Sequence, residues 1–361
     1  MQSKSAIRRG NKGRKELVKA HRRIASRMHA NAKKRGHAKS LYKNAITYQA
    51  AAASYTEAML RNILNANDNR VSQNASLLMH CITSIADGMR TEAYRNGFSI
   101  GKELYRMLNS DKHYETYEES IPGLVSFFEN AGLGNVAYAA FEDMLSLDVY
   151  SNEHRYVGSS IHVFESGIIS GFVSSGRRNY SIISERACAN NNSDHCEFVL
   201  EGTGYRGAEP VNGNIKGKEL LDMLLGHIHR PHYSNEYLSS SYMALLSAVV
   251  ADRRYIGEMN SIMRYIGSSI GDTLAKKGAS SRLQGMLNVL DSIYTGMVEV
   301  RSKKPMSFIM SFDGTKLNEA YVRLSLSLVE GIFSRAYSTK KMKAIEINRY
   351  NLHKIKIAEE R

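Results

Sequence analysis

The chain has 361 residues, of which 49 are Lys or Arg and 35 are Asp or Glu, so its formal net charge is +14. Segment Met1–Lys43 carries this excess: it holds fifteen basic residues and one acid, Glu16, and leaves 34 basic and 34 acidic residues elsewhere. A hydrophobic content of 43% excludes a disordered chain, and no run approaches the roughly 18 apolar residues of a membrane span. The three cysteines (Cys81, Cys188 and Cys196) exclude a disulfide framework and favour a reducing cytoplasm.

The basic arm, Met1–Lys43, has the composition of a segment that binds a polyanion. It is expected to be flexible over Ser3–Arg14, which contains two glycines, and helical over Lys15–Arg35. The alternatives are a solvated tail without a partner, a helix on a membrane surface and a transit peptide. The candidate nucleic-acid-binding residues of the arm are Arg8, Arg9, Lys12, Arg14, Lys15, Lys19, Arg22, Arg23, Arg27, Lys33, Lys34 and Arg35.

Two landmarks occur twice in the chain, in the same order. Gly97-Phe98-Ser99-Ile100-Gly101 matches Gly267-Ser268-Ser269-Ile270-Gly271, and Phe164–Ile168 resembles Leu328–Ile332. The two offsets are nearly equal, which indicates an internal duplication. Between the copies lies a stretch rich in Gly with Pro210, which is typical of a linker. The expected organisation is an arm over residues 1–43, a first domain over 44–202, a linker over 203–217 and a second domain over 218–361.

The order of predicted elements is similar in both copies, with helices first and short strands last. This order predicts the α+β class, with helices packed on a small antiparallel sheet. The alternating stretch Ala137–Tyr150 is predicted as one strand. The predicted helices are Ala45–Ala66, Leu77–Tyr94, Gly123–Asn130, Gly158–Ser174 and Lys316–Tyr337, and the predicted closing strands are Tyr180–Glu185, Glu197–Leu200, Lys343–Ile347 and Lys354–Ile357.

The strongest chemical signal lies between the closing strands of the first copy. Glu185 and Cys188 precede a polar turn, and Cys196 follows it, so the two thiols are expected at one hairpin mouth. Soft thiolates beside a harder oxygen suit zinc. The alternatives are a disulfide, a redox pair, which usually has closer spacing, and ordinary small residues at strand ends.

The pattern Glu-x-x-Cys, an Asn-rich turn and Cys196-Glu197-Phe198 resembles the 4-vinyl reductase domain family. The resemblance covers about Leu77–Gly202, with a degenerate copy over about Leu220–Ala358. It implies a fold like that of trafficking-complex subunits of the TRAPP type, which is also the fold of hydrocarbon sensors in bacterial activators. It further implies one structural zinc ion held by Glu185, Cys188, Cys196 and a residue near the start of the preceding helix, which is His162 here. His195 is the rival fourth ligand.

The second copy departs from the family pattern because it contains no cysteine. His353 stands opposite Cys196, the turn before it is shorter, and no metal is expected there. By analogy with single-domain relatives that form homodimers, the two copies are expected to pack as an internal pseudo-dimer, with further self-association as an option. A second His cluster, His227-x-His229-x-x-His232, is a weaker metal candidate because Arg230 and Pro231 interrupt it.

Three functions are compatible with these features. The leading hypothesis is a non-catalytic cytoplasmic protein, in keeping with an archaeal source, that docks on RNA or the ribosome through its basic arm. The second is a sensor of a small hydrophobic ligand, although the chain shows no output module. The third, an enzyme of tetrapyrrole reduction, follows only from the family's name, because no redox-cofactor or phosphate-binding motif is present.

Overall fold

The protein was described from a computed structural model. The description covers residues 53–72, 75, 78–80, 82–83, 87–141, 144–150, 162–177, 181–187, 195–203, 237–250, 254–294, 299–304, 307–313, 319–337, 342–346 and 352–359. By its internal contacts the chain divides into two units, Met1–Thr56 and Glu57–Arg361. The arm and most of the linker predicted from the sequence lie outside the described residues, as does the cluster His227-x-His229-x-x-His232.

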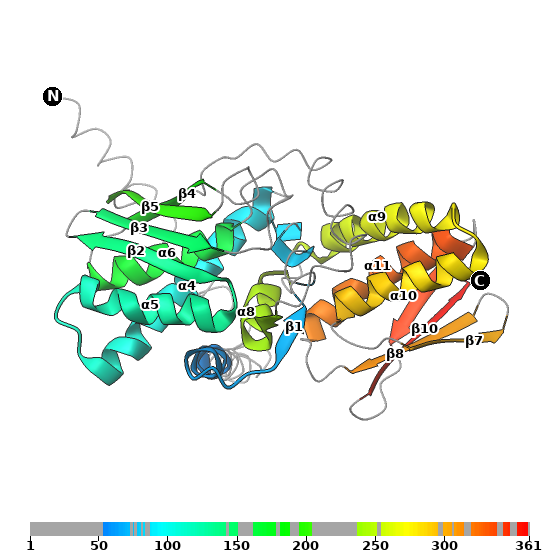
Figure 1. The fold of residues 1–361 in the computed structure, drawn as a ribbon, viewed down its shortest axis with the longest axis horizontal. Helices are drawn as coiled ribbons and strands as arrows, with labels where there is room; N and C mark the ends of the chain where they lie inside the picture. Colours follow the sequence, from blue (N-terminus) through cyan, green and yellow to red (C-terminus); the bar gives the residue numbers. More distant parts are fainter. Residues whose placement is uncertain are drawn as a thin grey trace, which may run out of the picture. The chain divides into compact units, whose positions relative to one another are not determined.

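The first half of the second unit consists of helices and a four-stranded antiparallel sheet (Figure 1). The predicted single strand Ala137–Tyr150 is wrong, because this segment contains parts of two paired strands, β2 and β3. Helical residues 53–64 come first. The elements that follow are β1 (Arg70–Ser72), helical residues within 75–83, α4 (Asp87–Lys112), α5 (Tyr117–Ala131), β2 (Asn135–Phe141), β3 (Met144–Tyr150), α6 (Val163–Gly176), β4 (Ser181–Ala187) and β5 (Cys196–Thr203).

The second half repeats this order of elements. Its sheet has the strand order β7-β8-β10-β9, which matches the order β2-β3-β5-β4 of the first sheet position by position. Helices therefore pack on antiparallel sheets in both halves, and the predicted α+β class is confirmed. The elements are β6 (Tyr237–Ser239), α8 (Ser240–Val250), α9 (Ile256–Ala275), α10 (Ala279–Tyr294), β7 (Glu299–Lys304), β8 (Ser307–Asp313), α11 (Glu319–Tyr337), β9 (Met342–Glu346) and β10 (Leu352–Glu359).

Helix α5 shows how local sequence defines an element. Thr116 caps its start, where the Thr116 hydroxyl accepts a hydrogen bond from the Glu119 N–H at 3.4 Å. Gly132 ends the helix in the left-handed conformation, with φ of 85°, which glycine adopts without steric cost. Between these caps, apolar side chains such as Leu124 and Phe128 are buried against the rest of the first half. The capping residues and the apolar face thus both predict a helix with these bounds.

The repeated Gly-x-x-x-Gly landmarks lie inside helices and mark the places where two helices cross closely. In the first half, a Cβ atom on Gly97 or Gly101 of α4 would collide with a backbone carbonyl of α6, and one on Gly167 or Gly171 with a carbonyl of α4. The second half keeps this crossing through Gly267 and Gly271 of α9 and Gly331 of α11, but Arg335 stands where the fourth glycine is expected. The duplicated motif therefore encodes a helix crossing that each half uses.

We expect Gly171→Ala to destabilise the protein, because the added methyl group would meet the carbonyl oxygen of Phe98 on a rigid backbone. Overpacking of this kind costs about 1–3 kcal/mol of unfolding free energy. Gly257→Ala is the matched control, since Gly257 lies near the start of α9 and a methyl group added there would have nothing within 4 Å. Urea denaturation of both variants measures the difference. Equal stabilities would contradict the close crossing.

The two halves are connected by a short pair of antiparallel strands, β1 and β6. Val71 pairs with Leu238 at the centre, Arg70 pairs with Ser239, and Ser72 pairs with Tyr237. Asp68 reinforces this junction, because its carboxylate accepts hydrogen bonds from the Ser240 hydroxyl at 2.6 Å and the Ser241 N–H at 2.7 Å, at the start of α8. Burial alone raises the pKa of Asp68, but these hydrogen bonds and that of Ser239 outweigh it and lower the pKa.

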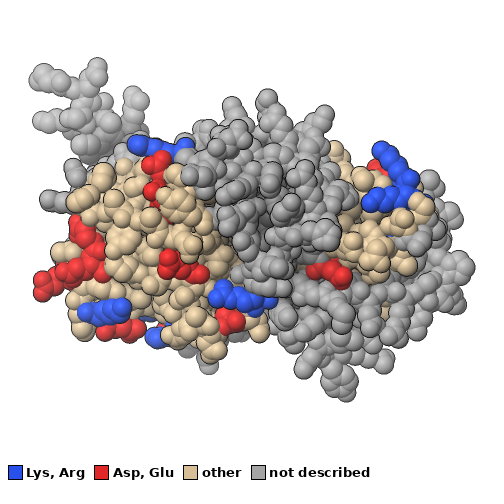
Figure 2. All heavy atoms as spheres, viewed as in Figure 1, with Lys and Arg blue, Asp and Glu red and all other residues tan. Residues whose placement is uncertain are grey.

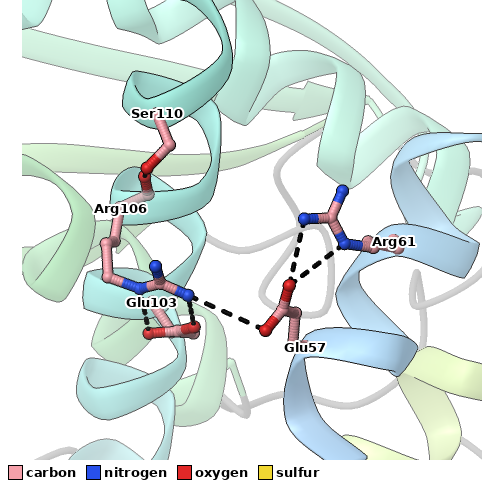
Figure 3. A network of polar contacts seen from close by, with 5 residues as sticks. All are labelled: Glu57, Arg61, Glu103, Arg106 and Ser110. Atoms are coloured by element: carbon pink, nitrogen blue, oxygen red, sulfur yellow. Dashed lines mark hydrogen bonds and ion pairs between the residues drawn. The ribbon is translucent and has the colours of Figure 1, made fainter. Parts of the chain in front are cut away.

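A network of exposed charges joins the first described helical segment to α4 (Figure 3). Arg61 contacts Glu57 at 3.0 Å, and Arg106 reaches the other oxygen of Glu57 at 3.9 Å while it also pairs with Glu103. Side chains this exposed are screened by water and salt, so the network aligns the two helices without contributing much free energy. Among the described residues, no helix is both long enough and apolar enough to cross a membrane.

Candidate metal centre

Three potential metal ligands meet in the first half at the junction of α6 and the β4–β5 hairpin. Ligand atoms of His162, Glu185 and Cys196 all lie within 4.8 Å of one another. His162 Nδ1 is 2.8 Å from Glu185 Oε1 and 3.7 Å from Cys196 Sγ. His162 and Cys196 are buried, and the Glu185 side chain is 5% exposed. This buried group can hold a metal ion.

The local structure explains why these three side chains face one another. Cys196 is the first residue of β5 and Glu185 lies near the end of β4, and the register places Glu185 opposite Phe198. Because alternate residues of a strand point to the same face, Cys196 and Phe198 share the face on which Glu185 lies. His162 immediately precedes α6, and its ring packs edge-on against Phe198 at a centroid distance of 6.2 Å.

The donor types suit a tetrahedral ion, and one of two donor separations already has the length that such an ion requires. The usual Zn–N and Zn–S bond lengths place a nitrogen and a sulfur ligand about 3.6 Å apart. The observed separation of His162 Nδ1 and Cys196 Sγ is 3.7 Å. The separation of His162 Nδ1 and Glu185 Oε1, 2.8 Å, is a hydrogen-bond length, and it would need to open to about 3.3 Å around an ion.

Two further metal ligands, Cys188 and His195, were candidates from the sequence. Cys188 follows the last residue of β4 directly in the sequence and lies outside the described residues. His195, the rival fourth ligand, packs its ring against Tyr150 at a centroid distance of 5.2 Å and is not part of the group of three. The twelve candidate nucleic-acid-binding residues of the arm also lie outside the described residues.

Beside the three ligands lies a buried polar cluster that the sequence did not reveal. His80 Nε2 is 2.6 Å from Glu165 Oε1, and the hydroxyl of Tyr242, on α8 of the second half, donates to the same oxygen. All three side chains are at most 2% exposed. The ring of His80 lies edge-on to that of His162, with centroids 5.6 Å apart. The cluster therefore links the second half to the surroundings of the candidate metal ligands.

Glu165 is ionised in this cluster. Burial alone raises the pKa of Glu165, but the charge and hydrogen bond of His80, then the charge of His162 and the hydrogen bond of Tyr242, lower it to about 2. Burial, followed by the neighbouring carboxylate, raises the pKa of Tyr242, so its hydroxyl keeps its proton. Oε2, the second carboxylate oxygen of Glu165, is buried and has no hydrogen-bond partner among the described residues.

We expect Tyr242→Phe to lower the unfolding free energy by about 1.5–3 kcal/mol, the usual loss when a hydrogen bond to a charged group is removed. The substitution deletes the hydroxyl that donates to Glu165 and keeps the ring that packs against Phe164. Tyr321→Phe is the control, because this buried hydroxyl donates to a neutral acceptor, the carbonyl of Ile293, at 2.9 Å. Urea denaturation should show the smaller loss for the control, and a reversed order would contradict the role of Glu165.

The corresponding hairpin of the second half differs in chemistry. His353 pairs with Phe312 in the β8–β10 register, as Cys196 pairs with Val149 in the β3–β5 register, so the two residues occupy equivalent strand positions. In the described part of the chain, the group around His162 is the one cluster of three or more potential metal ligands. Among the described residues, the candidate metal ligands thus lie in the first half.

Comparisons with known proteins add little to this description. No protein-family model matches the chain, and no curated protein matches it. Among solved structures, the phenol-responsive sensory domain of the transcription activator PoxR, with phenol, aligns with a TM-score of 0.31 and 14% sequence identity. The alignment covers 42% of this chain and 81% of that chain. A likeness of this size does not establish a shared family.

Proposed function

We propose that this protein is a non-catalytic binding protein that docks on nucleic acid, RNA or the ribosome, through its basic arm. The observation that carries the proposal is the separation of charge: fifteen basic residues and one acid in Met1–Lys43, and equal numbers of both signs in the rest. Clustered cations displace counterions from phosphates, and this displacement drives sequence-independent binding to nucleic acid. The remainder of the chain has no net charge, so in this proposal it does not contribute to the attraction of phosphates.

The described surface of the body supports this division. On the face drawn in Figure 2, Lys and Arg side chains of the described residues are interspersed with Asp and Glu, without a broad basic patch among them. Exposed arginines such as Arg61 and Arg106 are moreover paired with carboxylates of the same surface. The proposal therefore assigns the phosphate contacts to the arm rather than to the described residues of this face.

The body serves, in this proposal, as a scaffold that one zinc ion stabilises. His162, Glu185 and Cys196 supply three ligands, and Cys188 supplies the fourth, as the resemblance noted above implies. Four protein ligands close the coordination shell, so the ion would fix the hairpin to α6 and leave no open position for catalysis. Thiolate ligands of this kind suit the reducing cytoplasm.

We further propose that the two halves form an internal pseudo-dimer. Matching strand orders in the two sheets support it. So does the β1–β6 pair, whose register is symmetric about Val71 and Leu238, as two-fold related strands require. Loss of the metal ligands from the second half is then tolerable, because that half contributes its fold and its contact surface.

The test of the nucleic-acid proposal is affinity purification of the tagged full chain from lysates treated or not treated with nuclease. RNA and RNA-bound proteins should be recovered from the untreated lysate and lost on nuclease treatment. Recovery of the same partners from both lysates would overturn the proposal and indicate a protein partner for the body.

A second candidate function is a sensor of a small hydrophobic molecule, and one observation favours it. Glu165 Oε2 is buried without a partner among the described residues, and the aromatic rings of Phe127 and Phe164 pack against Tyr242 of the same cluster. A ligand with an apolar body and one hydrogen-bond donor would satisfy this oxygen. Native mass spectrometry of the purified protein would detect such a ligand as an added mass, and its absence after extraction under mild conditions would count against a sensor.

A further inference from the structure

Among the described strands, β2 lies at an edge of the first sheet, and its composition is unusual for an edge strand. In the strand order β2-β3-β5-β4 it has a described neighbour on one side only. All seven of its residues are exposed or partly exposed, and none is charged. Tyr138, at its centre, is 46% exposed, and Phe141, at its end, is 61% exposed. Such a strand offers a template for pairing with another chain.

The equivalent edge strand of the second half provides an internal comparison. In the matching strand order, β7 takes the place of β2, and its six residues include Glu299, Arg301, Lys303 and Lys304. Charged residues, above all Lys, are the usual means by which proteins prevent pairing at an exposed sheet edge. The edge strand β7 of the second half thus contains charged residues, and the equivalent edge strand β2 of the first half contains none.

The backbone groups that face outward from β2 are arranged symmetrically about Tyr138. The Val136 N–H donates to the exposed Glu129 side chain at 3.3 Å, so it points away from β3. Alternate residues of an antiparallel strand turn their backbone N–H and C=O groups to the same edge. The backbone groups of Tyr138 and Ala140 therefore also point away from β3. The structure records no hydrogen bond from a described residue to the outward backbone groups of Tyr138 and Ala140.

We propose that β2 is a homodimerisation edge, at which the β2 strands of two copies pair antiparallel about a two-fold axis through Tyr138. This register pairs Val136 of one copy with Ala140 of the other and Tyr138 with its own equivalent. A second copy is favoured as the occupant because it brings an equally uncharged strand, so that the paired strands themselves place no charges opposite one another. The exposed Glu129 side chain, which accepts from the Val136 N–H in the single chain, turns into water when that N–H pairs with the other copy. The molecule already joins its halves in this way, through the symmetric antiparallel pair β1–β6. The proposal is independent of the partner of the arm.

The test is sedimentation equilibrium of the nuclease-treated full chain in about 0.5 M salt, where repulsion between the two arms is screened. Wild type should form a dimer with a Kd on the order of micromolar. Tyr138→Lys and Tyr138→Glu should each weaken the dimer at least roughly tenfold, because each places like charges opposite one another. Tyr265→Lys is the control, since Tyr265 is 61% exposed on α9, away from any sheet edge, and it should leave the dimer unchanged.

An equimolar mixture of Tyr138→Lys and Tyr138→Glu separates the pairing from a general loss of fold. Opposite charges then face each other across the axis, and the dimer should return. A wild type that is monomeric at about 100 μM would overturn the proposal. A dimer that survives both single substitutions, or a mixture that stays monomeric, would overturn it as well.

Discussion

The purified protein is expected to contain one zinc ion per chain, and Cys196→Ser is expected to release it. A zinc ion bound at about 1,000 times its Kd stabilises the native state by about 4 kcal/mol, so its loss should lower Tm by roughly 10 °C. His162→Ala should have the same effect, because His162 lies 3.7 Å from Cys196 and 2.8 Å from Glu185. Metal analysis by inductively coupled plasma mass spectrometry and thermal unfolding measure the two quantities.

Two neighbouring residues provide matched controls for this prediction. Glu197→Gln removes a carboxylate from β5 next to Cys196 but on the opposite face of the sheet, so it should retain the zinc ion, whereas Glu185→Gln should lose most of it. His195→Ala should also retain the ion, because the His195 ring packs against Tyr150. A wild type that is isolated without metal and does not gain stability on addition of zinc would refute the site.

RNA binding by the full chain is expected to depend steeply on salt. If six to ten arm cations contact phosphates, affinity should fall by about three to five decades between about 50 and 200 mM salt. Replacing the twelve candidate residues of the arm, Arg8 to Arg35, by Gln should abolish most of the binding and flatten the dependence on salt. Fluorescence anisotropy with a labelled single-stranded RNA measures both, and a duplex DNA of equal length tests the preference for RNA.

Exposed arginines of the body serve as the control for charge alone. Arg61, Arg95 and Arg106 have side chains more than half exposed, and each pairs with a carboxylate of the same surface. Their replacement by Gln should leave the salt slope within about one unit of wild type, since no phosphate contact is assigned to them. A flat salt response of the wild type would exclude the arm as the main contact.

The repeat and the region of the candidate metal site can be predicted from the sequence, because short sequence patterns mark both. Gly97 and Gly101 recur as Gly267 and Gly271 since the same helix crossing requires small residues at the same spacing. The hairpin signature likewise placed Glu185 and Cys196 together, because strand alternation and a polar turn determine which side chains meet.

Other features had no local signature. The two residues between β2 and β3 in the sequence are Glu142 and Asp143, without the Gly that usually marks a hairpin, so the alternating pattern alone predicts one continuous strand. The contact of Glu165 with Tyr242 spans 77 positions and joins two separate helices, and no periodicity in either helix encodes it. Long-range polar contacts of this kind depend on how the halves pack.

The β1–β6 junction has a consequence for synthesis of the chain. Asp68 and Ser239 are 171 positions apart, so at about 5–20 residues per second β6 is made roughly 10–30 s after β1. During this interval β1 has no partner strand, and Glu165 lacks the hydroxyl of Tyr242. The first half therefore gains its last strand pair and the Tyr242 hydroxyl only when the second half emerges.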